Sequence, residues 1–526
     1  MHNLIALIVT GAYLVRTGRL VLYLVFLWQK REYRIDRMRS HLETPLGRKL
    51  IAGPMALFKW LLFLIFLFVR ESRILIAVYW LFWLSWIVEA ALNLHELIIR
   101  GWKIPKLTGK AFLILLVSWA VLFLPIMTVI WFAPLFWAPL IDRLPGPLVA
   151  ILVIAGLLPT TIIQRIAIRR ARTKLEHFRN LKTVALTGSY GKTSTKEILK
   201  QILSSQYRVV ATPGSVNTEI GIAKLINRQV NEETEVLIVE AGAYRRGEIA
   251  GISRLVKPGA AVITGIGMQH IDLFGSIENT VQAKYELAAR LPDKGFLAVN
   301  GENKYCRQIA EKARSRGLTV QSVTTSDEFS SFNADTNGLN FKMNGSKIMV
   351  RTNLLGEHNL QNIAMAVVIS REYFKLTDSQ IVRALQGIEP ADKTMKSVFR
   401  SDILTLVDDT FNVTYEGLVA AADYAVKYQG DKYLVLTPLI ELGEKANEVH
   451  LALGRKLSAV FTKIIVTNDN YSTELKKKST VPVKTVSASI ISDILTSAKK
   501  ETVVIFEGKE AQKWLKKMLF DLNESL

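Results

Sequence analysis

The feature that most constrains this 526-residue chain is a set of five apolar stretches in its first third. Their approximate bounds are 3–28, 51–69, 74–97, 111–134 and 147–163. Each has close to the ~20 residues that a helix needs to cross a bilayer. Arg16 and Arg19 lie in the first stretch, where a charged side chain is costly unless it faces a protein interior. The pattern predicts an α-helical transmembrane domain over residues 1–164, with about five helices.

Basic residues alternate between the loops that join these stretches. The segments 29–50 and 98–110 and the residues after 164 are rich in Lys and Arg, whereas the two remaining loops hold only Arg70, Arg73 and Arg143. Cytoplasmic loops carry the basic excess in membrane proteins. We therefore expect a multi-pass protein of the cell membrane, with its N-terminus outside and its C-terminal part cytoplasmic.

The distribution of charge also bears on partners. Residues 1–182 hold 24 Lys and Arg against 8 Asp and Glu, a net charge of +16 out of +21 for the chain, and nine of the ten Trp residues lie there too. This combination favours a lipid bilayer as partner over a nucleic acid. The single cysteine, Cys306, excludes an intramolecular disulfide and a four-thiolate zinc site within one chain.

Each of two polar segments in the first third of the chain can be interpreted in two ways. Glu89, His95 and Glu96 either line a polar site or are solvated near a membrane edge. The basic segment 165–182 is expected to be a helical linker that either lies on anionic headgroups or only connects two domains.

The next segment, TVALTGSYGKTSTKEILK at 183–200, predicts a strand, a glycine turn and a helix. In the turn, Gly188-Ser189-Tyr190-Gly191-Lys192-Thr193, the glycines allow backbone N–H groups to approach phosphates. Lys192 is expected to reach the β/γ oxygens of ATP, and the Thr193 hydroxyl to bind Mg²⁺. A chance glycine turn between a strand and a helix is the alternative.

Three further positions fit a site beside this turn. Glu240 ends a predicted strand at 236–239, where a second Mg²⁺ contact is expected. His270 is predicted at the end of another strand, and Lys284 on the helix after it. Taken alone, each has an ordinary structural interpretation: a strand-end carboxylate, a hydrogen-bonding His and a solvated Lys.

From Thr183 to about residue 515 the chain resembles the Mur ligases, which are ATP-dependent amide-bond-forming enzymes of cell-wall precursor synthesis. Within that family it is most similar to the branch that adds D-alanyl-D-alanine. The segments that carry the resemblance, in chain order, are TGSYGKTSTKE, VNTEIGIA, VEAGAYRRGEI, MQHIDLFGSIENTVQAKYEL, AVNGEN, LLGEHNLQNIAMA, LVDDTFNVTYEGLVAA and TPLIELGEKANEVH.

The resemblance implies roles for residues of the site. Lys192 and Thr193 would bind ATP phosphates and Mg²⁺, and Glu240 would also hold Mg²⁺. His270 and Lys284 would serve a second Mg²⁺, with Lys284 carbamylated into an anionic oxygen donor. Other residues are implied near the nucleotide or the acyl phosphate: Asn300, Asn359 and Asn362 at the adenine, Asp409 at the nucleotide, and Asn217 and Asn412 near the substrate.

Two departures from the family pattern are evident. The family's last domain begins with an Arg that meets the ATP phosphates, and Lys393 occupies that region here without the planar guanidinium fork. The family's N-terminal domain, which holds the UDP-sugar, is replaced by the apolar segment.

The predicted architecture is a transmembrane domain followed by α/β structure: a P-loop-type central ATPase domain at 183–390 and a Rossmann-like C-terminal domain at 391–526. Small strands over 318–352 are expected to be appended to the central sheet. The predicted activity is ATP-dependent ligation of D-Ala-D-Ala, or another amino acid, to a peptidoglycan-precursor peptide, soluble or lipid-linked. The alternatives are an amide ligase acting on another lipid or polymer and a non-catalytic membrane nucleotide-binding protein.

Overall fold

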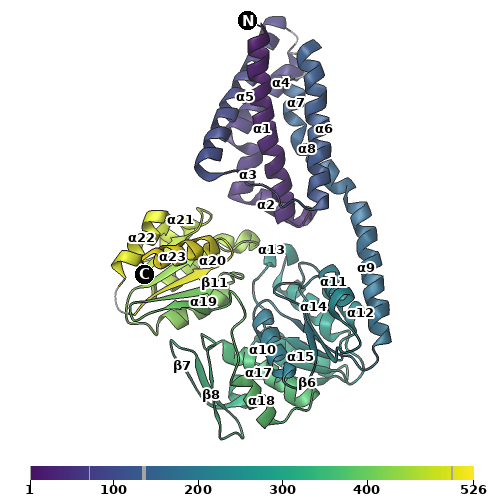
Figure 1. Ribbon diagram of the computed structural model, residues 1–526, viewed down its shortest axis with the longest axis vertical. Helices are drawn as coiled ribbons and strands as arrows, with labels where there is room; N and C mark the ends of the chain where they lie inside the picture. Colours follow the sequence, from purple (N-terminus) through teal and green to yellow (C-terminus); the bar gives the residue numbers. More distant parts are fainter. Residues whose placement is uncertain (1, 70, 133–137, 499–500, 526) are drawn as a thin grey trace. The chain divides into compact units, whose positions relative to one another are not determined.

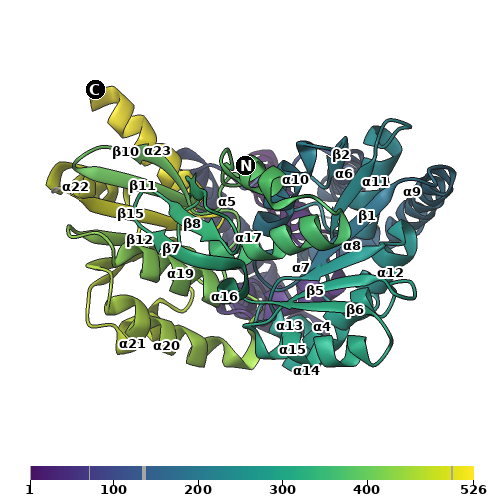
Figure 2. The ribbon, with the colours of Figure 1, turned by 90° about the horizontal axis from the view of Figure 1, so that it is seen from below.

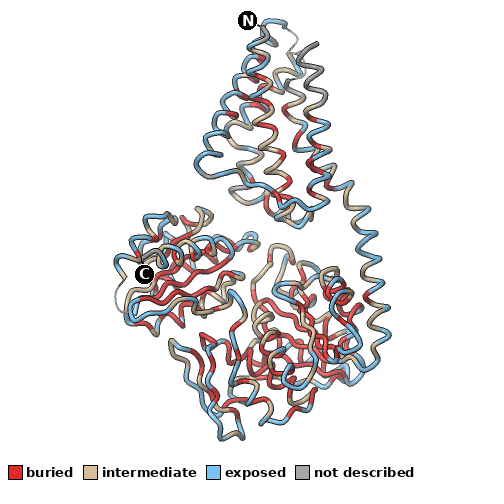
Figure 3. Tube along the Cα trace, viewed as in Figure 1, coloured by how far each residue is buried: buried red, intermediate tan, exposed pale blue. Residues whose placement is uncertain are grey.

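The computed structural model describes residues 2–69, 71–132, 138–498 and 501–525, and the chain divides into two compact units (Figure 1). Unit 1 comprises residues 1–164 and unit 2 residues 165–526. Each unit has its own buried core (Figure 3).

Unit 1 is helical where the sequence is apolar. Its helices are α1 (His2–Lys30), α2 (Ile35–Glu43), α3 (Pro45–Ala52), α4 (Pro54–Phe68), α5 (Ser72–Arg100), α6 (Gly109–Phe132), α7 (Ala138–Arg143), α8 (Pro145–Ala155) and α9 (Leu157–His177), the last of which continues into unit 2. Among the described residues, three helical stretches are long and apolar enough to cross a membrane: Leu7–Lys30, Ser72–Ile99 and Pro145–His177. Pro54–Phe68 and Gly109–Phe123 are shorter apolar helices.

Three details of unit 1 differ from the expectation of about five helices joined by loops. The basic segment 29–50 forms the short helices α2 and α3, and α7 is a further short helix. The last apolar stretch is interrupted at Gly156, between α8 and α9. Helix α9 then runs through most of the predicted linker.

Helix α9 is held firmly by unit 2 beyond residue 164. Ala171 is fully buried in a core cluster of that unit. The Lys174 ammonium donates to the carbonyls of Ile226 and Asn227, each at 3.1 Å, and Asn227 donates to the carbonyl of Ala167 at 2.9 Å. This part of the basic segment is therefore a packed element of the α/β unit.

The first sheet of unit 2 is six-stranded and parallel, in the order β2-β3-β1-β4-β5-β6. Its strands are β1 (Lys182–Thr187), β2 (Val209–Ala211), β3 (Val236–Glu240), β4 (Ala260–Ile263), β5 (Phe296–Asn300) and β6 (Thr319–Val323). The central strands are continuous buried apolar runs, as expected of a parallel sheet covered on both faces.

Helices cover both faces of this sheet (Figure 2). One face packs against α10 (Lys192–Ser204), α17 (Asn359–Val368), η1 (Ile369–Tyr373) and α18 (Asp378–Leu385). The other packs against α11 (Glu219–Gln229), α12 (Glu248–Val256), α14 (Ile277–Ala288) and α15 (Lys304–Arg314). The short helix α13 (Ile271–Phe274) precedes α14.

The segment 318–352 contributes to two sheets. Strand β6 pairs with β5 at the edge of the parallel sheet, as expected of a strand appended to it, whereas the strands after β6 do not join this sheet. After α16 (Thr325–Glu328), the strands β7 (Phe329–Ala334), β8 (Leu339–Met343) and β9 (Met349–Thr352) form a separate antiparallel sheet.

The last sheet has the order β10-β11-β15-β12-β13-β14, with β10 antiparallel and the others parallel. Its strands are β10 (Lys396–Arg400), β11 (Leu404–Asp409), β12 (Lys432–Leu436), β13 (Lys463–Val466), β14 (Val483–Thr485) and β15 (Thr502–Glu507). One side of this sheet is covered by α19 (Tyr415–Ala425), α20 (Ala446–Ser458), α21 (Ser472–Lys478) and η2 (Gly443–Lys445). Helices α22 (Ala488–Ser497) and α23 (Ala511–Ser525) lie on the other. A doubly covered, mostly parallel sheet is the predicted α/β arrangement.

Candidate active site

The predicted phosphate loop joins β1 to α10. Gly191 caps α10 with a φ of 78°, a left-handed conformation that favours glycine, and a Cβ there would lie 2.7 Å from Oδ1 of Asn362. In the described structure no side chain caps the first turn of α10, so its amides remain for a ligand. The Lys192 ammonium donates to the carbonyls of Gly188 (2.7 Å) and Ser189 (3.2 Å), and burial lowers its pKa. An anionic ligand would give this ammonium a better partner than two neutral carbonyls.

Glu240 lies at the centre of the polar groups beside this loop. It ends β3 and is 2% exposed. The Thr193 hydroxyl donates to its Oε2 at 2.9 Å, and the Asn217 amide donates to its Oε1 at 3.3 Å. The fully buried ammonium of Lys196 lies 3.6 Å from the same Oε2. Sequence reasoning missed Lys196, although it follows Lys192 by one helical turn on α10.

These groups fit a magnesium ion that is shared with a nucleotide. Mg²⁺ prefers oxygen ligands and is commonly held by one or two carboxylates together with substrate phosphates and water. Glu240 and Thr193 supply a carboxylate and a hydroxyl in mutual contact. Among the residues that the structure describes, no group of three His, Cys, Asp or Glu side chains forms a self-sufficient metal site. A Mg²⁺ ion held by Glu240 and Thr193 would have positions left for phosphate oxygens and water.

His270 and Lys284 lie within electrostatic reach of this loop. Burial and, to a smaller extent, the charge of Lys192 lower the pKa of Lys284 to about 7, against the opposing charges of Glu240, Glu248 and Glu286. Burial also lowers the pKa of His270, and the charges of Lys192 and Lys284 act in the same direction, whereas a hydrogen bond to Glu441 opposes them. The structure thus brings Lys192, His270, Lys284 and Glu240 together.

His270 does not end a strand, in contrast to the prediction. Strand β4 ends at Ile263, and His270 precedes α13 with a φ of 59°. Its ring is hydrogen-bonded through Nδ1 to the carboxylate of Glu441, which lies beyond β12 in the last part of the chain. This contact links the two sheet-bearing parts of unit 2. Glu441 could have been found only through its place in the ELGE segment, because it is 171 residues from His270.

The three asparagines expected near adenine are buried and engaged internally. Asn362 accepts from the Thr195 hydroxyl at 3.1 Å and donates to Asn359 at 2.8 Å. Asn359 in turn donates to the carbonyl of Leu355, and Asn300 donates to the carbonyl of Thr264 at 2.9 Å. In this structure these side chains brace the phosphate loop and the end of β5.

The other two loop residues are anchored to the segment after β4. The Ser189 amide donates to the carbonyl of Gly265 at 2.6 Å, and its side chain is buried. Tyr190 accepts a hydrogen bond from Asn303 at 3.0 Å, and burial raises the pKa of its phenol to about 12. Through these contacts, both residues help to fix the conformation of the loop.

The three residues predicted in the C-terminal part, Asp409, Lys393 and Asn412, differ from one another in their burial. Asp409 ends β11 next to Glu507 on β15, and burial raises the pKa of both carboxyl groups, that of Asp409 to about 7. The Met395 amide donates to Asp409 at 3.2 Å. Lys393 and Asn412 are exposed, and the ammonium of Lys393 forms no hydrogen bond or ion pair within the described residues. Glu507 was not predicted from the sequence.

Comparison with known proteins finds similar sequences. Residues 186–370 match the Mur ligase middle domain. The chain is 28% identical to the UDP-N-acetylmuramoyl-tripeptide–D-alanyl-D-alanine ligase of Bacillus subtilis over 360 residues, covering 65% of this chain and 76% of that protein.

Solved structures show the same similarity. The crystal structure of MurF from Acinetobacter baumannii has a TM-score of 0.63 at 26% identity, over 69% of this chain and 80% of that one. MurF of Thermotoga maritima in complex with ADP has a TM-score of 0.61 at 24% identity, over 69% and 85%, which shows a shared fold.

Proposed function

We propose that this chain joins D-alanyl-D-alanine, or another amino acid, to a peptidoglycan-precursor peptide at a membrane. The proposal proceeds from its being an ATP-dependent ligase of the Mur type, in which residues 186–370 match the Mur ligase middle domain. The observation that carries the proposal is the contact of Thr193 with Glu240 beside Lys192, with His270 and Lys284 in electrostatic reach. The acceptor is a carboxylate and the donor an amine.

The reaction has two balanced steps. An oxygen of the acceptor carboxylate attacks the γ-phosphorus of ATP, which forms an acyl phosphate and releases ADP. The donor amine then attacks the acyl carbon, loses a proton and expels phosphate, which leaves an amide. Mg²⁺, when bound, supplies positive charge to the phosphate oxygens.

The residues of the chain contribute charge and position. Lys192 and the first amides of α10 neutralise and orient the phosphates, since they are preorganised donors in a partly water-excluded site. Glu240 and Thr193 would hold the metal. Glu441 fixes the ring of His270 so that it keeps one orientation towards the site.

We also propose that Lys284 is carbamylated when the enzyme is active. Carbon dioxide adds only to an uncharged amine, and a pKa of about 7 leaves a substantial uncharged fraction of Lys284 near neutral pH. The carbamate carries a negative charge, which the ammonium of Lys192 and a second Mg²⁺ would balance. Labelling with ¹³C-bicarbonate tests this: a carbamate carbon signal is expected in the native chain and is absent from Lys284→Gln.

The membrane location is part of the same proposal. The apolar helices of unit 1 and the alternation of basic loops support a multi-pass protein whose unit 2 is cytoplasmic. A lipid-linked acceptor is favoured over a soluble one, because a catalytic unit joined to membrane helices acts close to the bilayer surface.

The test uses the full chain in nanodiscs with ATP, Mg²⁺ and D-Ala-D-Ala. We expect ADP release, and a product heavier by the dipeptide, with a lipid-linked or soluble muramoyl-tripeptide. Lys192→Ala removes both, whereas Lys200→Ala, an exposed lysine of the same helix, retains them. Absence of ADP release with every carboxylate acceptor would refute the proposal.

A further inference from the structure

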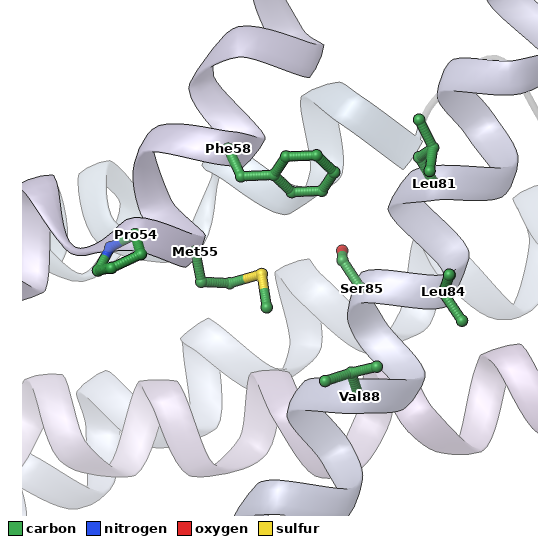
Figure 4. A pocket seen from close by; sticks show the side chains of 7 residues that line it. All are labelled: Pro54, Met55, Phe58, Leu81, Leu84, Ser85 and Val88. Atoms are coloured by element: carbon green, nitrogen blue, oxygen red, sulfur yellow. The ribbon is translucent and has the colours of Figure 1, made fainter.

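The pocket between α4 and α5 of unit 1 has an apolar lining (Figure 4). It has a volume of about 350 Å³, and Met55, Phe58 and Val88 are among the residues that line it. The hydroxyl of Ser85, which also lines it, donates to the carbonyl of Phe82 at 2.7 Å. This lining has no group that would recognise a charged substrate. Exposed positive charge close to the candidate active site lies instead in unit 2.

That charge is carried by the loop between β3 and α12, residues 241–247, called here the arginine loop. The loop starts immediately after Glu240 and contains the adjacent residues Arg245 and Arg246. Both arginines are exposed, whereas Glu240 is buried. The arginine loop therefore leads from the candidate metal ligand outward to two guanidinium groups.

The first half of the arginine loop lies against residues of the candidate site. The Gly242 amide donates to the carbonyl of Asn217 at 2.9 Å, and a Cβ on Gly242 would lie 2.6 Å from the Asn217 side chain. The same Asn217 side chain donates to Glu240. Further along, the ring of Tyr244 meets the ring of His270 edge-on, with ring centres 4.8 Å apart. The loop thus passes both the carboxylate and the imidazole of the site.

The second half of the arginine loop is fastened to the helix that carries Lys284. Glu286, two residues further along α14, accepts hydrogen bonds from the amides of Gly247 at 2.6 Å and Ala250 at 3.0 Å. The loop is therefore anchored on both sides of its arginines. An ion pair formed on an anchored backbone costs little additional ordering, which favours binding.

The carboxylates closest to the arginines already have partners. Glu248 accepts a hydrogen bond from the Tyr244 amide at 2.7 Å and lies 3.3 Å from Nε of Arg245, whose side chain is 70% exposed. An exposed ion pair of this kind is weak and exchanges readily with a ligand. Arg246 forms no hydrogen bond or ion pair with any residue that the structure describes. Its guanidinium is available to an anion.

The position of Arg246 limits which part of an acceptor it can meet. Arg246 follows Tyr244 by two residues, which is at most about 7 Å of chain, and Tyr244 contacts His270. In the proposed reaction the carboxylate that is activated lies at the γ-phosphate, beside the same group of residues. One peptide residue adds about 3.5 Å, so a carboxylate on the neighbouring residue of the acceptor falls within this range. A carrier phosphate at the far end of a tripeptide is at least roughly 10 Å away.

We propose that Arg246, assisted by Arg245, binds a second carboxylate of the peptide acceptor, on the residue next to the one that is activated. A guanidinium offers two parallel N–H donors that match the two oxygens of a carboxylate. This contact holds the acceptor in register with the γ-phosphate and selects acceptors that carry the second negative charge. The inference rests on the proposed ligase function and names a specificity-determining residue for it.

The test measures equilibrium binding of fluorescently labelled acceptors to the full chain in nanodiscs, with Mg²⁺ and a non-hydrolysable ATP analogue. One probe is muramoyl-L-Ala-γ-D-Glu-L-Lys, whose glutamyl residue has a free carboxylate next to the reacting lysyl carboxyl group. The other is the same peptide with that glutamyl carboxylate converted to a primary amide. We expect the native chain to bind the first probe about tenfold more tightly, as one charge-assisted contact predicts.

The variants assign this difference to the arginine. Arg246→Gln should weaken binding of the free-carboxylate probe about tenfold and leave binding of the amide probe unchanged, with partial recovery in Arg246→Lys. Turnover should show the same change in the KM of the acceptor with little change in kcat. Arg254→Gln, which removes an exposed arginine of α12 outside the arginine loop, should bind both probes as the native chain does.

Several outcomes would overturn the proposal. They are no binding of either probe by the native chain, equal affinity for both probes, and an equal loss for both probes in Arg246→Gln. Weaker binding of farnesyl pyrophosphate by Arg246→Gln would assign the arginine to a carrier phosphate and would also overturn it. Carboxylate-dependent binding without ADP release from ATP would refute the ligase proposal alone, so the two failures are distinguishable.

Discussion

The neighbouring carboxyl groups of Asp409 and Glu507 are expected to make the stability of the chain depend on pH. The two residues are directly opposite each other on β11 and β15, and Glu507 is fully buried. Burial raises the pKa of Asp409 from 3.8 to about 7, and both burial and the charge of Asp409 raise that of Glu507. Between pH 4 and pH 7 the folded chain therefore binds more protons than the unfolded chain.

Because the folded chain binds more protons than the unfolded chain between pH 4 and pH 7, the free energy of unfolding falls as the pH rises through this range. For Asp409, a pKa difference between 3.8 and about 7 corresponds to a loss of about 4 kcal/mol above pH 7, at roughly 1.4 kcal/mol per pH unit. Glu507→Gln keeps the shape, removes one of the two acids and lets its amide donate to an ionised Asp409. We expect this variant to have a higher Tm than the native chain at pH 8.5, by several degrees, and a similar Tm at pH 4.5.

The assay is thermal unfolding of the full chain at pH 4.5, 6, 7 and 8.5, with the exposed Glu448→Gln as control. The control should follow the native pH profile. If the Tm curves of Glu507→Gln and the native chain run parallel at every pH, burial of the pair has no energetic cost and the reasoning is refuted.

Three further outcomes concern the phosphate loop and its neighbours. Lys196→Met should lower the Tm and abolish ATP turnover, because breaking a buried ion pair costs roughly 3–5 kcal/mol, whereas Lys200→Met should change neither. Gly191→Ala should weaken the binding of a fluorescent ATP analogue at least tenfold, since a left-handed φ costs about 1–2 kcal/mol and the new Cβ meets Asn362. Glu441→Gln should lower ligase turnover by roughly 10-fold to 100-fold with little change in ATP affinity, since a charge-assisted hydrogen bond contributes about 1.5–3 kcal/mol.

Each outcome can fail in a distinct way. Normal turnover in Lys196→Met would show that Glu240 does not need this cation. Undiminished nucleotide binding in Gly191→Ala would show that the loop adapts to a side chain. A parallel loss of ATP affinity and turnover in Glu441→Gln would place Glu441 in nucleotide binding and not in the orientation of His270.

Local patterns in the sequence were enough to predict the α/β part and its phosphate loop. The buried apolar runs before Gly188 and Glu240 become central parallel strands, because such runs are stable only between two helical layers. The glycines and Lys192 predict the loop, since backbone approach to phosphate needs that chemistry within a few residues. Arg16 and Arg19 are paired with Glu89 and Glu96, which satisfies the requirement that they face protein.

Other features depend on residues that are distant in sequence. Sequence patterns placed His270 at a strand end, whereas the chain continues seven residues past β4 to a left-handed turn and contacts Glu441. Lys59 and Asp142 were not recognised as partners, because nothing in either segment indicates that α4 and α7 meet.

The sequence by itself thus determined which segments are apolar, which are regular and where the candidate phosphate loop lies, because these properties arise from periodicity and composition within a few turns of chain. The tertiary structure decided which charges are neutralised by a distant partner, as at Lys196 beside Glu240 and at Lys59 beside Asp142. The free energy of a buried charge depends on partners brought within a few ångströms by packing, and that proximity is encoded in no single segment.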